Sequence, residues 1–167
     1  MSTKLVVYYS WSNGNTKRIA EKIAEEIGAD IRQIDTVEPY QGSYDEVVDQ
    51  GQNEVNRGYM PKIKPPDVDI KDYDVVAVGT PTWWYTMAPA VLTFLNQNDW
   101  SGKKVIPFMT NGGWPGHVIE DMIKECEGAE IINPMEVKFD SQGGAVLKTP
   151  EDKIDDWIAE IKNSLQI

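Results

Sequence analysis

The 167-residue chain has few of the side chains from which catalytic centres are most often built: it contains one cysteine, Cys126, and one histidine, His117. A single cysteine cannot form an intramolecular disulfide, and its place in a helical pattern over residues 118–127 indicates a partly buried, small apolar residue. His117 has no serine, cysteine or acidic partner at catalytic spacing, which favours a solvent-facing residue at a helix start. We therefore expect neither a metal site nor a catalytic residue.

Positive charge is also scarce, since 16 lysines and arginines stand against 27 aspartates and glutamates and give a net charge of −11. Such an excess of acid repels nucleic acid and anionic lipid. No apolar run approaches the length of a membrane span, and no signal-peptide pattern opens the sequence. These absences predict a soluble cytoplasmic protein without nucleic-acid or membrane partners, whose acidic surface would suit a basic partner protein.

Two common phosphate-binding motifs are missing, the Walker pattern G-x-x-x-x-G-K-[ST] and the dinucleotide fingerprint G-x-G-x-x-G, which argues against a nucleoside triphosphate or tightly bound NAD. Instead, residues 10–16 (SWSNGNT) separate an apolar run at 4–9 from a helical pattern at 17–27. A strand, a small turn and a helix in this order direct free backbone N–H groups at one point, which suits a phosphate. An ordinary helix cap is the alternative interpretation of the same residues.

Strand and helix patterns alternate along the whole chain. Strands are expected at residues 4–9, 30–35, 73–79 and 103–109, with a last strand over 130–139 bent near Pro134, and helices at 17–27, 44–55, 86–95, 117–127 and 150–165. This order predicts one α/β domain over residues 1–167, with a doubly wound, five-stranded parallel sheet in a three-layer α/β/α sandwich. Ligands of such sheets bind at the carboxyl ends of the strands, where the loops after strands one, three and four meet.

Aromatic residues gather in the second and third of these loops. Residues 80–89 (TPTWWYTMAP) hold two tryptophans and a tyrosine, and residues 110–116 (TNGGWPG) hold Trp114 beside a glycine pair. Aromatic faces for stacking, with glycine N–H groups able to approach a ring edge, suit a flat heteroaromatic ligand with a phosphate tail. For each residue alone, a tryptophan that closes the core or a simple glycine turn is the alternative.

These stretches resemble the flavodoxin-like FMN proteins. KLVVYYSWSNGNTKRIAEKI is similar to the family's first strand, phosphate loop and helix, and DYDVVAVGTPTWWYTMAPAVLTFL with KKVIPFMTNGG is similar to its two isoalloxazine loops. The TP-x-WW variant is especially similar to small bacterial members. The resemblance implies FMN as cofactor and the strand order 2-1-3-4-5 known for flavodoxin. Compared with the usual T-x-T-G-x-T turn, the chain either has a turn one residue longer or has Asn13 in place of a hydroxyl residue, and the loop after the third strand lacks the family's glycine.

The resemblance also assigns cofactor-binding residues by position. The FMN phosphate would be bound by Ser10, Ser12, Asn13, Gly14, Asn15 and Thr16. One side of the flavin would be lined by Pro81, Thr82, Trp83, Trp84 and Tyr85, and its pyrimidine edge or other face by Asn111, Gly112, Gly113 and Trp114.

Because the chain offers no acid, base or nucleophile of its own, the redox chemistry would belong to the cofactor. The function implied is low-potential electron transfer between a reductase and an acceptor protein, both with basic docking surfaces. The alternative is an NAD(P)H-dependent quinone or azo reductase, which needs room above the flavin. A receiver-type signalling domain is disfavoured because Ser10 and residues 79–80 stand where its acids would be. The oligomeric state and the roles of residues 36–66, Gly143 and Gly144 stay open.

Overall fold

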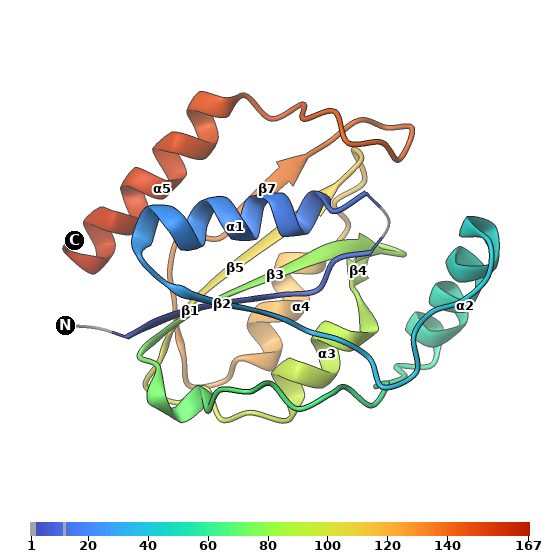
Figure 1. Ribbon diagram of the computed structural model, residues 1–167, viewed down its shortest axis with the longest axis horizontal. Helices are drawn as coiled ribbons and strands as arrows, with labels where there is room; N and C mark the ends of the chain where they lie inside the picture. The colour runs from blue at the N-terminus through green and yellow to red at the C-terminus, as the bar shows by residue number, and fades with distance from the viewer. Residues whose placement is uncertain (1–2, 12) are drawn as a thin grey trace.

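The computed structural model describes residues 3–11 and 13–167, and it has a parallel sheet between two layers of helices (Figure 1). Four strands run side by side in the order β2 (Asp30–Gln33), β1 (Lys4–Tyr8), β3 (Val75–Trp83) and β5 (Lys104–Asn111). The fifth position is shared by β6 (Glu130–Ile131) and β7 (Met135–Lys138), which pair with successive parts of β5. The doubly wound, five-stranded parallel core is therefore confirmed, with its last strand interrupted near Pro134.

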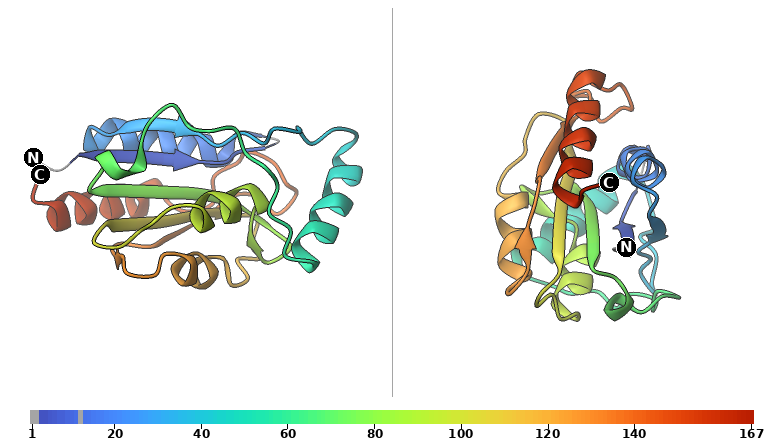
Figure 2. Two further views of the ribbon diagram at one scale, coloured as in Figure 1. Left: turned by 90° about the horizontal axis from the view of Figure 1, so that it is seen from below. Right: turned by 90° about the vertical axis from the view of Figure 1, so that its left-hand side faces the viewer.

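Helices cover both faces of this sheet, as the end-on view in Figure 2 shows. On one face lie α1 (Asn15–Ile27) and α5 (Glu151–Leu165), and on the other lie α3 (Pro89–Asn96) and α4 (Val118–Glu125). Successive side chains of a strand point to opposite faces of the sheet, so Val6 packs toward α1 and α5 while Leu5 and Val7 pack toward the other layer. A short 3-10 turn, Ile70–Asp72, leads into β3.

Helix α2 (Tyr44–Asn56) stands apart from the two layers, beyond the carboxyl ends of the strands (Figure 1). Ser43 caps its start by accepting a hydrogen bond from the Glu46 N–H. Because α2 lies there, the segment between β2 and β3 covers the end of the sheet where a ligand is expected. Among the described residues, no helix is both long and apolar enough to cross a bilayer.

The helix expected over residues 86–95 is wrong in its first turn. β3 runs on to Trp83, the chain reverses through Trp84 and Tyr85, and β4 (Thr86–Met87) returns antiparallel to β3 before α3 begins at Pro89. Trp84 and Tyr85 have φ values of 51° and 71°. Two consecutive residues with positive φ are the geometry of a two-residue hairpin turn whose twist matches that of the strands. We refer to residues 82–87 as the aromatic hairpin.

Candidate functional site

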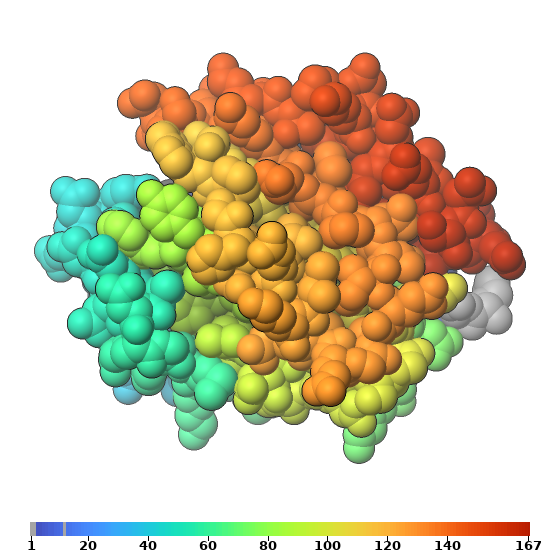
Figure 3. Space-filling model, turned by 180° about the vertical axis from the view of Figure 1, so that it is seen from behind, coloured from blue at the N-terminus to red at the C-terminus, as the bar shows by residue number. Residues whose placement is uncertain are grey.

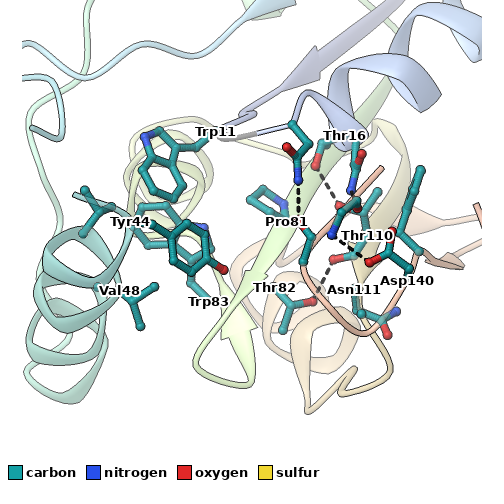
Figure 4. A pocket seen from close by; sticks show the side chains of 18 of the residues that line it. Trp11, Thr16, Tyr44, Val48, Pro81, Thr82, Trp83, Thr110, Asn111 and Asp140 are labelled. Atoms are coloured by element: carbon teal, nitrogen blue, oxygen red, sulfur yellow. Dashed lines mark hydrogen bonds between the residues drawn. The ribbon is translucent and has the colours of Figure 1, made fainter. Parts of the chain in front are cut away.

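A cavity of about 290 Å³ opens at the carboxyl ends of β1, β3 and β5 (Figure 4). All three predicted loops reach it, together with α2 and residues 139–144. The polar side chains lie near the start of α1, and the rings of Trp11, Tyr44 and Trp83 lie on the side of α2. The predicted residues that line it are Asn13, Asn15, Thr16, Pro81, Thr82, Trp83, Trp84, Asn111 and Gly112.

The polar half is built on the turn that precedes α1. Gly14 caps the helix with a φ of 74°, and its carbonyl accepts the Arg18 N–H at 2.9 Å, so the helix starts directly at the turn. The first N–H groups of a helix have no partner within it and carry partial positive charge. Gly14 itself does not line the cavity, and Ser12 lies outside the described residues.

Two asparagine side chains tie this turn to the segment after β7. The Asn13 amide donates to the Gly143 carbonyl, and the Asn15 amide donates to the Gly144 carbonyl at 3.0 Å. Both glycines line the cavity, so their role, which the sequence left open, is to form part of the wall of the candidate site. The Ser10 hydroxyl is buried and has no hydrogen-bond partner among the described residues, although Ser10 is not part of the cavity lining.

This donor set fits a phosphate monoester. It combines a helix N-terminus with amide and hydroxyl donors, and among the described residues the cavity lining contains no lysine or arginine. Asp140, the one charged residue among the described residues of the lining, was not predicted from the sequence. Its carboxylate accepts the backbone N–H groups of Val146 at 2.9 Å and Gly144 at 2.8 Å, and these bonds hold the pKa of Asp140 below its usual value. Asp140 thus orders the segment that faces α1.

Two threonines join the polar half to the sheet. The hydroxyls of Thr16 and Thr110 are 2.9 Å apart, and both residues are buried. The Thr82 hydroxyl donates to the Thr110 carbonyl at 3.0 Å, which connects β3 to the same point. The start of α1 is therefore held in register with the ends of β3 and β5.

Asn111 orders the turn after β5. Its Oδ1 accepts the Gly113 N–H at 2.7 Å, while its Nδ2 donates to the Val137 carbonyl at 3.4 Å. A Cβ at Gly112 would lie 3.1 Å from the Asp140 carbonyl oxygen, so a larger residue here would require this backbone to shift by a few tenths of an ångström. Asn111 and Gly112 line the cavity, whereas Gly113 does not.

The aromatic half is a wall anchored by several rings. Trp83 packs edge-on against Tyr40, Tyr9 and Trp11, with ring centroids 5.0, 5.9 and 6.1 Å away. Trp11 stacks on Tyr44 with a centroid distance of 5.7 Å and an angle of 25° between the rings. Trp83 was predicted from the sequence, whereas Trp11 and Tyr44 were not. Trp11 lies within the SWSNGNT stretch, so an aromatic residue inside a phosphate turn was the available signal.

The tip of the aromatic hairpin lies at the rim of the cavity. The Trp84 indole N–H donates to the Val48 carbonyl at 2.8 Å, which joins the hairpin to α2. Tyr85 and Trp114 do not line the main cavity; they are 53% and 58% exposed and border a neighbouring hollow of about 230 Å³ with Thr82, Trp84 and Gly112. The four large rings expected around one ligand are thus divided, with Trp83 and Trp84 in the cavity and Tyr85 and Trp114 beside it.

Two further predictions concern residues outside the cavity. Cys126, expected to be partly buried, is only 3% exposed, and burial raises the pKa of its thiol to about 12. The expectation that His117 has no acidic partner at catalytic spacing is wrong, because its Nδ1 contacts the Asp121 carboxylate one helical turn away. His117 is exposed and stands at the N-cap of α4, as a helix-start residue should.

Comparison with known proteins shows the family to which the chain belongs. A family model described as Flavodoxin matches residues 3–161, and the chain therefore belongs to the flavodoxin family. This membership supports FMN as the cofactor. A search of curated proteins found no match.

Several solved structures share the fold. A flavoprotein from Lactobacillus acidophilus NCFM, crystallised in complex with FMN, is 22% identical, with a TM-score of 0.72 and coverage of 94% of this chain and 99% of that one. A candidate flavoprotein from Bacteroides eggerthii DSM 20697 is 28% identical, with a TM-score of 0.71 and coverage of 95% and 97%. A flavodoxin from the domain Archaea is 19% identical, with a TM-score of 0.58 and coverage of 99% and 100%.

Proposed function

We propose that the protein binds FMN in the cavity described above and transfers electrons at low potential between a reductase and an acceptor protein in the cytoplasm. The observation that carries this proposal is the union of a helix N-terminus and an aromatic wall in one cavity. The phosphate would lie at the start of α1, beside the lining residues Asn13 and Asn15, and the ring system would lie toward Trp83 and Trp84. FMN, when bound, supplies the redox chemistry.

The surroundings favour a low reduction potential. Apart from Asp140, the described residues that line the cavity are neutral, and those of its aromatic half include no cation that would stabilise added negative charge. The net charge of −11 acts in the same direction and would also attract partners with basic docking surfaces. We expect the association with such a partner to weaken as the salt concentration rises.

Reconstitution with FMN tests the binding step. The purified chain should take up one FMN, acquire a flavin absorption spectrum in the visible range and quench the flavin fluorescence. Asn13→Ala should weaken binding by about tenfold, because it removes the amide that ties this turn to Gly143 and the second N–H that this amide would offer to the phosphate. Asn163→Ala, an exposed position on α5, is the matched control and should leave the affinity unchanged. A protein that stays colourless with excess FMN would overturn the proposal.

One observation favours the reductase alternative. The hollow bordered by Tyr85 and Trp114 adjoins the main cavity and shares Thr82, Trp84 and Gly112 with it, which leaves exposed aromatic surface beside the flavin position. A nicotinamide or a quinone needs room of this kind. Steady oxidation of NAD(P)H by the FMN-loaded protein with a quinone, in the absence of any partner protein, would decide for the enzyme. No oxidation above the rate of free FMN would decide for the carrier.

A further inference from the structure

The sequence contains two asparagines that are followed directly by glycine, Asn13 before Gly14 and Asn111 before Gly112, and both pairs lie in loops of the candidate site. An asparagine in front of glycine is especially open to deamidation, because glycine has no Cβ to shield its backbone nitrogen from the asparagine side chain. The two pairs have the same chemistry, so a difference in their reactivity must come from the structure around them. Each pair is therefore a control for the other.

The first pair lies in an open part of the turn before α1. Asn13 is exposed, and a Cβ added at Gly14 would meet nothing within 4 Å. The Gly14 N–H has no hydrogen-bond partner among the described residues. Within the same part of the chain, the Asn13 side chain has one hydrogen bond, which its amide nitrogen donates to the Gly143 carbonyl. The surroundings therefore leave room for the backbone nitrogen of Gly14 to approach the Asn13 Cγ.

The second pair is enclosed. Asn111 is 9% exposed, and both polar atoms of its side chain are bonded, Oδ1 to the Gly113 N–H at 2.7 Å and Nδ2 to the Val137 carbonyl at 3.4 Å. A Cβ at Gly112 would lie 3.1 Å from the Asp140 carbonyl oxygen. In Figure 3 the gold segment after β5 lies between the lime aromatic hairpin and the orange segment after β7. Attack within this pair requires the side chain to leave its bonds, which opposes the reaction.

We propose that Asn13 is a site of spontaneous deamidation, and that its product disables the phosphate end of the candidate site. The backbone nitrogen of Gly14 loses its proton to hydroxide and attacks the Asn13 Cγ. The new C–N bond closes a cyclic imide, and the bond from Cγ to Nδ2 breaks, so that ammonia leaves with a proton taken from water. Water then opens the imide to aspartate or isoaspartate. The net reaction consumes water, releases ammonia and involves no oxidation.

The product has a carboxylate where the Asn13 amide stands. A carboxylate cannot donate to the Gly143 carbonyl, and it repels a phosphate near the start of α1. The fold itself should survive, because an acidic residue beside a helix N-terminus is favourable. The deamidation step is independent of FMN, whereas its effect on FMN affinity rests on the proposed function.

Incubation of the full-length protein without added FMN at mildly alkaline pH, followed by tryptic digestion and mass spectrometry, tests the modification. Trypsin releases Asn13 in peptide 5–17 and Asn111 in peptide 105–124, and a digest at time zero corrects for deamidation during digestion. We expect Asn13 to react at least about tenfold faster than Asn111 in the folded protein. In guanidinium chloride the two should react at similar rates, because the structure that distinguishes them is lost. Equal rates in the folded protein, or a difference that persists in guanidinium chloride, would overturn the proposal.

The variant Gly14→Ala tests the route of the reaction. Its methyl group shields the backbone nitrogen, so the reaction at Asn13 should slow by about tenfold while the rate at Asn111 stays the same. The imide route also gives isoaspartate together with aspartate. An unchanged rate at Asn13, or aspartate without isoaspartate, would show direct hydrolysis by water and would contradict the proposed attack by Gly14.

The variant Asn13→Asp tests the consequence, because it carries the new charge without the reaction. It should remain folded and bind FMN about tenfold more weakly than Asn13→Ala, since a repulsive charge is added to the loss of the amide. Equal affinities of the two variants would show that the product does not disable the site. A parent protein that does not bind FMN would overturn the proposed function and this effect on affinity, while the deamidation rates still decide whether Asn13 is modified.

Discussion

The turn before α1 and the aromatic hairpin lie at the carboxyl ends of two neighbouring parallel strands, β1 and β3. Both contain left-handed backbone, but at different types of residue. The first turn places Gly14 at a φ of 74°, where an added Cβ would meet nothing within 4 Å. The hairpin places Trp84 and Tyr85 at similar angles, which cost L-residues with large side chains about 1–2 kcal/mol each. One turn is relaxed and presents main chain, whereas the other is strained and presents rings.

The two turns are also stabilised by different kinds of contact. The hairpin is held by its pairing with β3, by the bond from the Trp84 indole to Val48, and by the His117 N–H, which donates to the Tyr85 carbonyl at 2.8 Å. A Cβ at Gly116 would lie 2.2 Å from that same carbonyl oxygen, so the neighbouring loop fits closely around the strained residue. The turn before α1 depends instead on side-chain bonds from Asn13, Asn15 and Thr16 to other segments.

The largest effect is expected from removal of the ring that anchors the hairpin. Trp83→Ala should lower the free energy of unfolding by about 3 kcal/mol, because a half-buried indole with three aromatic neighbours leaves a void. Urea denaturation of the FMN-free protein measures it. Trp114→Ala, which removes an indole that is 58% exposed, should change the value by less than about 0.5 kcal/mol. Similar losses for the two variants would mean that Trp83 does not anchor the hairpin.

The next effect concerns the bond between α1 and β5. Thr16→Val should cost about 2 kcal/mol, because it leaves the buried Thr110 hydroxyl without its partner across the 2.9 Å contact. The double variant Thr16→Val with Thr110→Val removes both hydroxyls, and we expect it to be more stable than the single variant. A double variant whose loss equals the sum of the two single losses would show that the hydroxyls do not interact.

The parallel sheet and the common rim of the three loops could be predicted from the sequence because they follow from local patterns. A continuous apolar run such as residues 75–78 needs cover on both faces, and strands that alternate with helices leave few topologies. The extent of the hairpin could not be predicted in this way. Thr86 and Met87 continue a helical pattern locally, and they become a strand only because Thr82 and Trp83 are there to pair with them.

The residues of the site that were not predicted also owe their positions to contacts between distant segments of the chain. Tyr44 reaches the cavity because α2 stands across the end of the sheet, and nothing near Tyr44 in the sequence specifies that position. Asp140 had a weak local signal, since an aspartate followed by Ser141, Gln142 and two glycines is typical of a turn in which the carboxylate accepts backbone N–H groups. Which helix that turn would face depends on contacts between distant segments.

The relaxed turn should lose stability if it is given a side chain. Gly14→Ala should cost about 1 kcal/mol, a backbone cost alone because the space around the new Cβ is open. Gly14→Asn should cost less, since asparagine tolerates left-handed backbone better than alanine does. Urea denaturation of both variants measures the order, and an alanine variant as stable as the parent would mean that the turn adopts another conformation.

The strained turn should respond in the opposite direction. Tyr85→Gly relieves a positive φ of 71° and removes a ring that is 53% exposed, so little packing is lost. The relief of about 1–2 kcal/mol exceeds the extra entropy that glycine loses on folding, about 0.5–1 kcal/mol, and we expect a net gain of about 0.5 kcal/mol. Tyr59→Gly, at a ring that is 41% exposed and has no positive φ, is the control and should not gain stability. If Tyr85→Gly destabilises the protein by more than about 0.5 kcal/mol, the ring itself supports the hairpin, and its exposure is a structural requirement of the turn rather than surface kept for a ligand or partner.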